Sequence, residues 1–264
     1  MTEKSTSITN QPAHRLLAAL GKRTLRPGGE ELTRRLLATL EIETGDDVVE
    51  FAPGVGSTAR LALARTPNSY TGIELDRERA AALRTELEDA APDRLGPEVV
   101  VGNAADTDLP RASADVVYGE AMLTMQPDAG KRAILEEAAR LLRPGGRYGI
   151  HELALTDGVD DETAAAIGRE AAQVANVRPR PLTESGWVDR LESTGFTVTW
   201  RAVEPMALLE PRRLLADEGL PGAVRIGYNL LRRPLARTRV RSLRRFFERY
   251  DGELTAIALV AERS

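Results

Sequence analysis

The sequence predicts an α/β domain with a mostly parallel, doubly wound sheet covered by helices on both faces. Short runs rich in valine and isoleucine alternate with helical patterns between residues 47 and 155. These runs are nearly continuously apolar, as in strands that are buried on both faces. Parallel strands require crossover helices, and the right-handed crossover rule then places helices on both sides of the sheet.

Length and composition suit one large domain. The chain has 264 residues, and 42% of them are hydrophobic, which is enough for an ordinary core. It has no cysteine and only two histidines, so we expect no disulfide and no metal site. The first residues lack the apolar core of a signal peptide, and no run approaches the ~20 apolar residues of a membrane span. We therefore expect a cytoplasmic protein.

The individual elements follow in order along the chain. Residues 1–12 are polar and are expected to be disordered, whereas residues 13–44 show two helical patterns. Strands are predicted at residues 47–52, 69–75, 98–104, 114–121, 147–155, 196–208 and 254–263. Helices are predicted at residues 58–64, 77–90, 131–142, 183–194 and 210–250, and the third of these should stop at the Arg-Pro-Gly-Gly of residues 143–146.

Polar side chains stand where five of the predicted strands end: Glu50, Glu74, Asn103, Glu120 and His151. Ligands of doubly wound sheets bind beyond the carboxyl ends of the strands. The sequence therefore predicts a ligand site at this edge.

A glycine turn, residues 52–57, follows the first of these strands. Gly54 and Gly56 let a ligand approach the main chain, and the next helix offers unpaired N–H groups. The turn also fits the dinucleotide pattern G-x-G-x-x-G/A. However, Glu50 at its mouth would repel a pyrophosphate and attract a cation. With Glu74 available for a ribose, this favours S-adenosylmethionine, which combines adenosine with a cationic amino-acid end.

These motifs resemble those of the class I S-adenosylmethionine-dependent methyltransferases, in their small-molecule branch. The resemblance covers about residues 45–155, with a looser likeness to the C-terminus. The family's first motif, acid-x-Gly-x-Gly-x-Gly, is present as "EFAPGVGS", with Ala52 and Ser57 in place of two glycines. The segments "ADVVYGEAM" and "LLRPGG" are also similar to the family.

The resemblance implies a Rossmann-like seven-stranded sheet with an antiparallel last strand. It implies one methyltransferase domain over residues 13–264, with a helical lid insertion at 206–250. It also implies that Glu74 binds the ribose hydroxyls, that the Asn103 amide oxygen meets the adenine amino group, and that the Ala104 N–H meets the ring. The other implied cofactor contacts are Glu50, Ala52, Pro53, Gly54, Gly56, Leu75, Gly119, Gly28 and Gly29. For the last two, a simple helix break is the alternative.

Catalytic residues are harder to predict, because methyl transfer mainly needs alignment of the acceptor with the methyl group. A base is required only if the acceptor must lose a proton. Glu120 is the first candidate, as a base or as a stabiliser of the sulfonium side, and a carboxylate bound to neighbouring main chain is the alternative. His151 is the second candidate, with a structural histidine as the alternative. The acceptor atom, O, N, S or C, is left open.

The charge is unevenly distributed. Residues 206–250 carry 11 Arg and four acids, a net +7, so the other 219 residues carry −11. Val240, Leu243, Phe247 and Tyr250 share a helical face, which predicts a lid helix docked on an acidic body. Alternatively, the arginines bind an anionic acceptor or an acidic membrane surface. A nucleic-acid partner is not expected, because the body is acidic and aromatic residues make up 4%. The oligomeric state is left open.

Two other functions stay open. The altered glycines at 52 and 57 are compatible with a cofactor-binding regulatory module that lacks turnover. The glycine turn is also compatible with an NAD-dependent Rossmann oxidoreductase, although Glu50 disfavours it.

Overall fold

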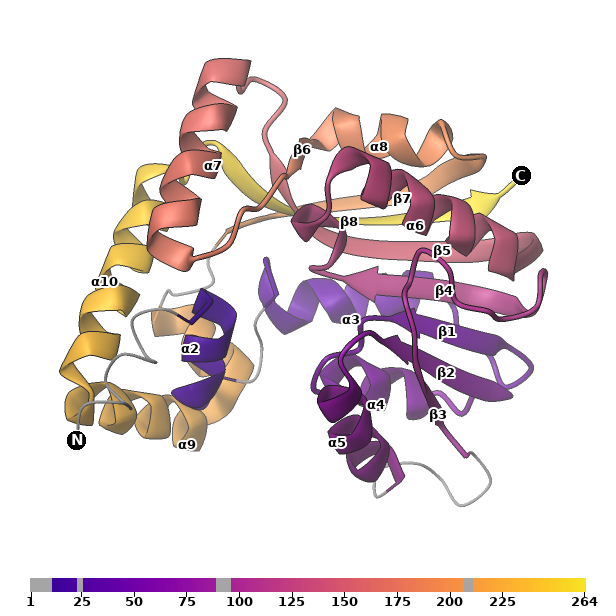
Figure 1. Ribbon diagram of the computed structural model, residues 1–264, viewed down its shortest axis with the longest axis horizontal. Coiled ribbons are helices and arrows are strands. Elements are labelled where there is room, and N and C mark those ends of the chain that lie inside the picture. The colour runs from indigo at the N-terminus through magenta and orange to yellow at the C-terminus, as the bar shows by residue number, and fades with distance from the viewer. Residues whose placement is uncertain (1–10, 23–25, 89–95, 207–210) are drawn as a thin grey trace.

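The computed structural model of the chain describes residues 11–22, 26–88, 96–206 and 211–264, with the backbone alone at 14, 211–214, 216 and 217. The disorder expected for residues 1–12 falls almost entirely outside the described residues. A central sheet carries a helical layer on each face, and further helices lie beyond one end of the strands (Figure 1).

The sheet has the strand order β3-β2-β1-β4-β5-β8-β7, and the short strand β6 pairs with β5 off this path. The strands are β1 (Asp47–Phe51), β2 (Ser69–Glu74), β3 (Glu98–Val101), β4 (Ala114–Glu120), β5 (Leu142–Leu155), β6 (Leu182–Thr183), β7 (Phe196–Pro205) and β8 (Leu254–Arg263). Neighbours among β1 to β5 are parallel, and β8 is antiparallel to both β5 and β7. The predicted doubly wound sheet and its antiparallel last strand are confirmed.

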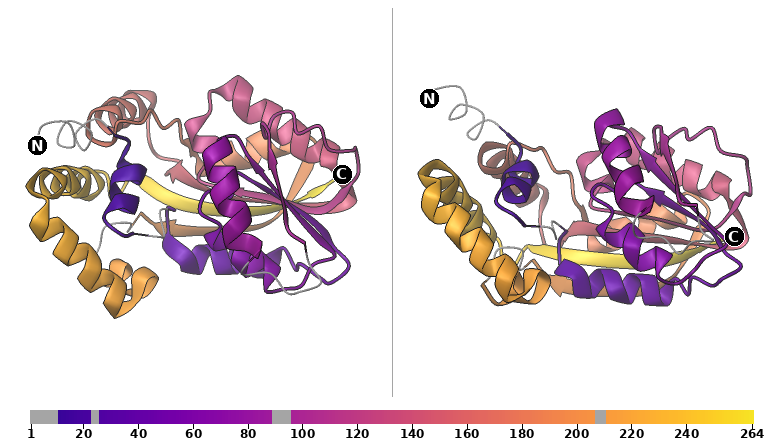
Figure 2. Two further views of the ribbon diagram at one scale, coloured as in Figure 1. Left: turned by 60° about the horizontal axis from the view of Figure 1, so that its bottom comes forward. Right: turned by 90° about the horizontal axis from the view of Figure 1, so that it is seen from below.

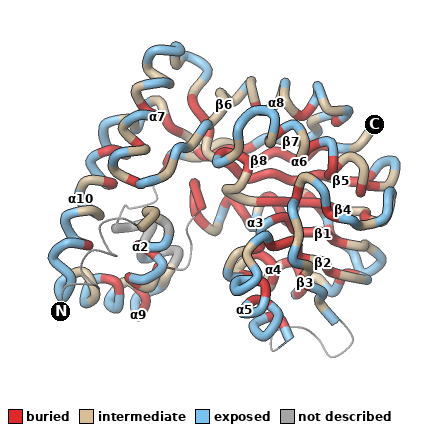
Figure 3. The backbone as a smooth tube through the Cα atoms, in the orientation of Figure 1, coloured by how far each residue is buried: buried red, intermediate tan, exposed pale blue. Residues whose placement is uncertain are grey.

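Helices cover both faces of this sheet. They are α2 (Ala13–Ala19), α3 (Gly29–Thr39), α4 (Ser57–Leu63), α5 (Arg77–Glu88), η1 (Leu123–Met125), α6 (Asp128–Leu141), α7 (Asp161–Ala175), α8 (Glu184–Glu192), α9 (Pro211–Arg232) and α10 (Pro234–Arg249). Leucines of α3 and α5 pack on one face, and Leu135 of α6 and Trp187 of α8 pack on the other. Buried residues therefore follow the strands and the inner sides of the helices (Figure 3).

Several elements differ from the sequence-based expectation: β5 begins earlier, α7 and β6 were not predicted, and the helical segment predicted at 210–250 forms two helices, α9 and α10. Residues 142–146 belong to β5 rather than to a terminating turn, because the chain passes from α6 into the strand with Leu142 already extended. Helix α7 was not predicted, because no element is expected between residues 155 and 183. Its N-cap is Asp160, whose side chain accepts a hydrogen bond from Thr163 N–H.

Helices α2, α7, α9 and α10 form a helical unit beyond the carboxyl ends of the parallel strands (Figures 1 and 2). An apolar cluster that includes Leu17, Ile167 and Phe246 joins α2, α7 and α10. The predicted face of α10 omitted Phe246, which is buried, while Phe247 is partly buried and packs edge-on against it. None of the described helices is long and apolar enough to cross a bilayer.

Side chains of α9 and its neighbours hold α2 by its main chain. Arg225 donates to the carbonyl of Gly21 at 3.1 Å, Asn229 to that of Leu20 at 3.0 Å, and Arg233 to that of Ala19 at 3.0 Å. These carbonyls lie at the C-terminal end of α2, where helices lack internal partners. On the other side of the unit, Arg249 pairs with Glu170 of α7 at 3.0 Å.

Candidate active site

The turn between β1 and α4 needs its two glycines for different reasons. Gly54 and Gly56 both have positive φ, 59° and 75°. A Cβ on Gly56 would lie 2.6 Å from Leu83 of α5, so this glycine permits close packing within the protein. A Cβ on Gly54 would meet nothing nearer than the Ala52 carbonyl at 3.9 Å. The open approach to the main chain is therefore at Gly54.

Ala52 adopts the left-handed conformation of the glycine that it replaces. Its φ is 53°, and its N–H donates to the Ile73 carbonyl at 2.9 Å. This conformation costs an L-residue roughly 1–2 kcal/mol. Ala52 thus holds the turn in a conformation that glycine would adopt more easily, at the expense of some backbone strain.

Glu50 is buried at the end of β1 between two tyrosines. Val48 of β1 is in register with Tyr70 of β2, and Glu50 with Tyr118 of β4, which places all three polar groups on the sheet face covered by α3. Both hydroxyls donate to Glu50 Oε2, at 2.6 Å from Tyr70 and 2.7 Å from Tyr118. Among the described residues no donor is paired with Oε1. Burial raises the pKa of Glu50 to about 7, despite the two hydroxyl donors.

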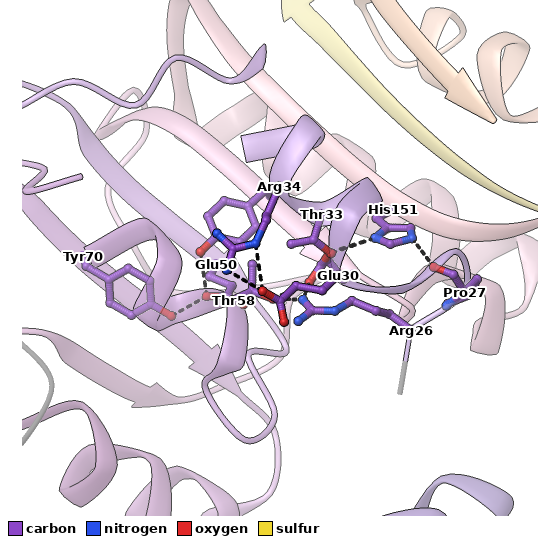
Figure 4. Close-up of polar contacts among 11 residues, drawn as sticks. Arg26, Pro27, Glu30, Thr33, Arg34, Glu50, Thr58, Tyr70 and His151 are labelled. Carbon is purple, nitrogen blue, oxygen red and sulfur yellow. Dashed lines mark hydrogen bonds and ion pairs between the residues drawn. The ribbon is translucent and has the colours of Figure 1, made fainter. Parts of the chain in front are cut away.

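Glu120, at the end of β4, is the centre of a buried polar network. Figure 4 shows Arg26, Thr33 and His151 of this network lying close together. Arg26 Nη1 lies 2.5 Å from Oε2, and Thr58 of α4 donates to the same oxygen. Thr33 of α3 donates to Oε1. Burial alone would raise the pKa of Glu120, but the Arg26 charge and the hydrogen bonds from His151 and Thr33 hold it well below its ordinary value.

His151 completes the network from β5, directly opposite Glu120 in the sheet register. Its Nδ1 lies 2.8 Å from Glu120 Oε1, and its Nε2 lies 2.5 Å from the Pro27 carbonyl oxygen. Both ring nitrogens thus lie beside oxygen atoms. The structure therefore brings together the two catalytic candidates, and it surrounds Glu120 with two cationic or potentially cationic groups.

Sequence reasoning did not identify the side chains of Arg26, Thr33 and Thr58 as groups of the site. Their partners are 32 to 118 positions away along the chain, so no local pattern connects them. The available signal was the position of Thr58 in the first turn of the helix that follows the glycines. Tyr118 was not predicted as a site residue either; it is a buried core residue whose hydroxyl also donates to Glu50.

Glu152 supports the loop after β4 from the opposite face of the sheet. Its carboxylate accepts hydrogen bonds from the N–H groups of Met122, Leu123 and Thr124, at 2.7 to 3.1 Å. The Thr124 hydroxyl donates to it as well, at 2.6 Å. Burial raises the pKa of Glu152, and these donors oppose the rise. The carboxylate fixes the loop that begins at Glu120.

The ends of β2 and β3 present the remaining predicted contacts. The Glu74 carboxylate accepts from Asp76 N–H at 3.1 Å, and Leu75 beside it is 73% exposed. Asn103 Oδ1 accepts from Ala105 N–H at 3.0 Å, which leaves one of its two lone pairs. Within the described part of the chain, no acceptor is paired with Ala104 N–H. An exposed leucine, an acid and an amide thus line this edge.

Three further glycines, Gly28, Gly29 and Gly119, were predicted as cofactor contacts. Packing within the protein or local backbone conformation accounts for a glycine at each of these positions. A Cβ on Gly28 would lie 2.8 Å from Ala256 of β8, and Gly28 has a φ of 66°. Gly29 also has positive φ, and its N–H donates to the Arg26 carbonyl at 3.3 Å. A Cβ on Gly119 would lie 3.4 Å from Phe51. Gly28 and Gly29 fit the helix-break alternative, and no contact with a ligand is needed to account for them.

Comparison with known proteins agrees with this fold. A family model described as a methyltransferase domain matches residues 48–146. An uncharacterized protein of Haemophilus influenzae is 33% identical over 226 residues, which cover 84% of this chain and 87% of that protein. Ribosomal RNA small subunit methyltransferase A of Streptomyces griseus is 30% identical over 203 residues, 68% of each chain.

Among solved structures, a phosphoethanolamine N-methyltransferase of Haemonchus contortus, in complex with phosphomonomethylethanolamine and S-adenosylhomocysteine, superposes with a TM-score of 0.70. The match covers 100% of this chain and 59% of that chain, at 16% identity, and it concerns the fold. The chain belongs to the class I S-adenosylmethionine-dependent methyltransferases, and S-adenosylmethionine is its cofactor.

The residues at the sheet edge fit this cofactor. The space beside Gly54 lets a ligand reach the main chain, and the exposed Leu75 side chain offers an apolar surface for the adenine ring. Among the described residues, Glu50 has a carboxylate oxygen that is paired with no donor. When bound, the cofactor supplies a methyl group on a positively charged sulfur. The chain's own groups have to hold that cation and align the acceptor.

Proposed function

We propose that this methyltransferase transfers the methyl group to a small molecule and holds its cofactor along the edge formed by β1, β2 and β3. The observation that supports this proposal is Glu50, a buried carboxylate directly before the open main chain of Gly54. A buried carboxylate with a raised pKa is stabilised by a cationic ligand group, which repays part of its desolvation.

Each predicted contact except Gly28 and Gly29 has a role in this proposal. Glu50 pairs with the positively charged amino-acid end, and Glu74 accepts from the ribose hydroxyls. Leu75 packs against the adenine, whose amino group donates to the free lone pair of Asn103 and whose ring nitrogen accepts from Ala104 N–H. Ala52, Pro53, Gly54, Gly56 and Gly119 shape the wall beside the amino-acid end.

Glu120 and His151 act by positioning in this proposal. A base must take up a proton, but Arg26 and the hydroxyl donors stabilise the ionised form of Glu120 and lower its pKa. The Glu120 network links α3, α4, β4 and β5, so it fixes the walls against which an acceptor is aligned. The alternative, a general base, requires that Glu120 release these partners during turnover.

Two candidate functions differ in the molecule that accepts the methyl group, which is either a small molecule or RNA. The relative from Streptomyces griseus is by name a ribosomal RNA methyltransferase, which makes RNA the second candidate. The net −11 of the residues outside 206–250 disfavours it, because RNA binding requires an extended basic surface. The basic segment favours an anionic small acceptor, and weak association with an acidic membrane surface is its alternative. The cytoplasmic location stays a prediction.

The test is a methyl-transfer screen with cofactor that carries a labelled methyl group. Pools of small metabolites and ribosomal RNA are supplied separately, and S-adenosylmethionine affinity is measured by calorimetry. The proposal expects label in a small-molecule fraction, and label in RNA alone would refute it. Tight cofactor binding with no transfer to any pool would instead support the regulatory module.

A further inference from the structure

The helical unit contains an open pocket of about 510 Å³ between α2, α9 and α10. This volume falls within the range of small-molecule sites, about 300–1,000 Å³. Apolar side chains from all three helices line it: Leu17 and Leu20 from α2, Ile226, Leu230 and Leu231 from α9, and Val240 from α10. The pocket therefore offers a continuous apolar wall.

The cations around this wall are not all neutralised. Arg237, Arg241 and Arg244 line the pocket from one side of α10, at spacings of four and three residues. Arg244 pairs with Glu248 at 2.7 Å, and Lys22, which follows α2 in the chain, lies 3.9 Å from Glu218. In the part of the chain that the structure describes, no acceptor is paired with Arg237 or Arg241. An apolar pocket thus carries two uncompensated guanidinium groups.

We propose that this pocket binds an amphiphile whose anionic head group meets Arg237 and Arg241 and whose apolar chain lies against the leucines of α2 and α9. Guanidinium groups form strong, directed hydrogen bonds with carboxylates and phosphates, which determines the charge of the head group. The leucine and isoleucine wall determines the character of the chain. The inference concerns binding alone and does not depend on methyl transfer.

The pocket lies near the sheet edge that holds the cofactor. Lys22 lines the pocket, and Arg26, four residues later, contacts Glu120 at 2.5 Å. Four residues span at most about 14 Å, at roughly 3.6 Å per residue. A bound amphiphile would therefore lie on the same side of the molecule as the cofactor.

Gly227 gives a direct way to close the pocket. It lines the pocket from α9, and a Cβ placed on it would meet nothing within 4 Å. The Gly227→Leu variant would fill the pocket with its side chain while improving the helix propensity of α9. Gly168→Leu on α7 is the matched control, because a Cβ there also meets nothing and the residue lies outside the pocket.

The test is calorimetric titration of the full chain with monomeric dodecanoate. We expect one dodecanoate per chain, and Gly227→Leu should weaken its binding at least about tenfold with an unchanged or raised Tm. Arg237→Gln/Arg241→Gln should weaken it by a similar factor. Gly168→Leu and Arg232→Gln/Arg245→Gln, which removes the same charge outside the pocket, should bind as the parent chain does.

Several outcomes would overturn the proposal. These are absence of dodecanoate binding, equal binding of dodecyltrimethylammonium, equal weakening by the control variants, and binding only to phosphatidylglycerol vesicles, which would indicate a membrane surface instead. Each variant is also titrated with S-adenosylmethionine. If dodecanoate binding is lost while S-adenosylmethionine binding stays normal, the loss concerns the pocket alone. If S-adenosylmethionine binding is lost as well, the result bears on the proposed function.

Discussion

Replacement of Glu50 by glutamine should make the protein more stable and a weaker binder of its cofactor. The side chain is buried, and its pKa is raised from 4.5 to about 7, mainly because burial disfavours the charge. At about 1.4 kcal/mol per pKa unit, the ionised carboxylate costs the folded state about 3 kcal/mol at pH 8. Glutamine keeps a carbonyl oxygen for Tyr70 and Tyr118 and remains neutral.

The sign of the effect with pH follows from the raised pKa. Glu50 destabilises the fold only when its carboxyl group is ionised. The contribution of the neutral group to the free energy of unfolding is fully present below pH 4.5, and it is lost as pH rises through 7. Chemical denaturation should therefore show Glu50→Gln more stable than the parent by up to about 3 kcal/mol at pH 8. The difference should shrink to about 1 kcal/mol or less at pH 5.

Cofactor binding should change in the opposite direction. Loss of a charged partner costs roughly 1.5–3 kcal/mol, so calorimetry should show affinity for S-adenosylmethionine about 10- to 150-fold lower. In the parent, binding below pH 7 should release a proton from Glu50, and this release should disappear in the variant. Glu78→Gln, on the exposed side of α5, is the charge-matched control. A variant that is no more stable than the parent at pH 8, or that binds the cofactor equally well, would refute the reasoning.

Four further predictions concern the same edge. Gly56→Ala should destabilise the fold by about 2–4 kcal/mol in denaturation experiments, because the added methyl group overpacks against Leu83 and strains the backbone. Gly54→Ala should instead mainly weaken cofactor binding, and equal effects of the two variants would contradict the different roles of these glycines. Ala52→Gly should relieve the left-handed conformation and stabilise the fold by up to about 1 kcal/mol. Asn103→Asp should keep cofactor affinity and Asn103→Leu should lose it, and equal calorimetric affinities would place the adenine elsewhere. Glu120→Ala should cost about 3–5 kcal/mol of stability, because it leaves Arg26 buried without its partner. By contrast, an essentially unchanged stability with a rate about 10²–10⁴-fold lower would favour the general base.

The sheet and the cofactor edge could be predicted because their signals are local. The run of residues 47–57 contains a buried strand, an acid and a glycine turn in immediate succession, and each has a direct physical meaning. The same holds for Glu74 and Asn103, which follow their strands. Strand periodicity and turn chemistry are properties of neighbouring residues, so they are visible in a single sequence.

The polar network could not be predicted because it depends on register and packing. His151 meets Glu120 only because β5 pairs with β4 in one register, and Thr33 joins them only because α3 lies across that face. Arg26 precedes α3 and looked like part of a helix break. Helix α7 was missed for a different reason, since its buried residues are Ile167, Ala171 and Ala175, and only one of these has a large apolar side chain.

The attachment of α9 and the start of α10 to α2 has a consequence for how this protein can change over evolution. Arg225, Asn229 and Arg233 bind carbonyl oxygens of residues 19–21, groups that every amino acid carries. Substitutions at Ala19 or Leu20 therefore leave the acceptors in place, as long as the helix end keeps its path. Gly21 is the exception, because its φ is 100° and a Cβ on it would lie 2.9 Å from Arg225 Nε. The side chains of α2 that face the pocket can diversify while the helices that enclose it stay anchored.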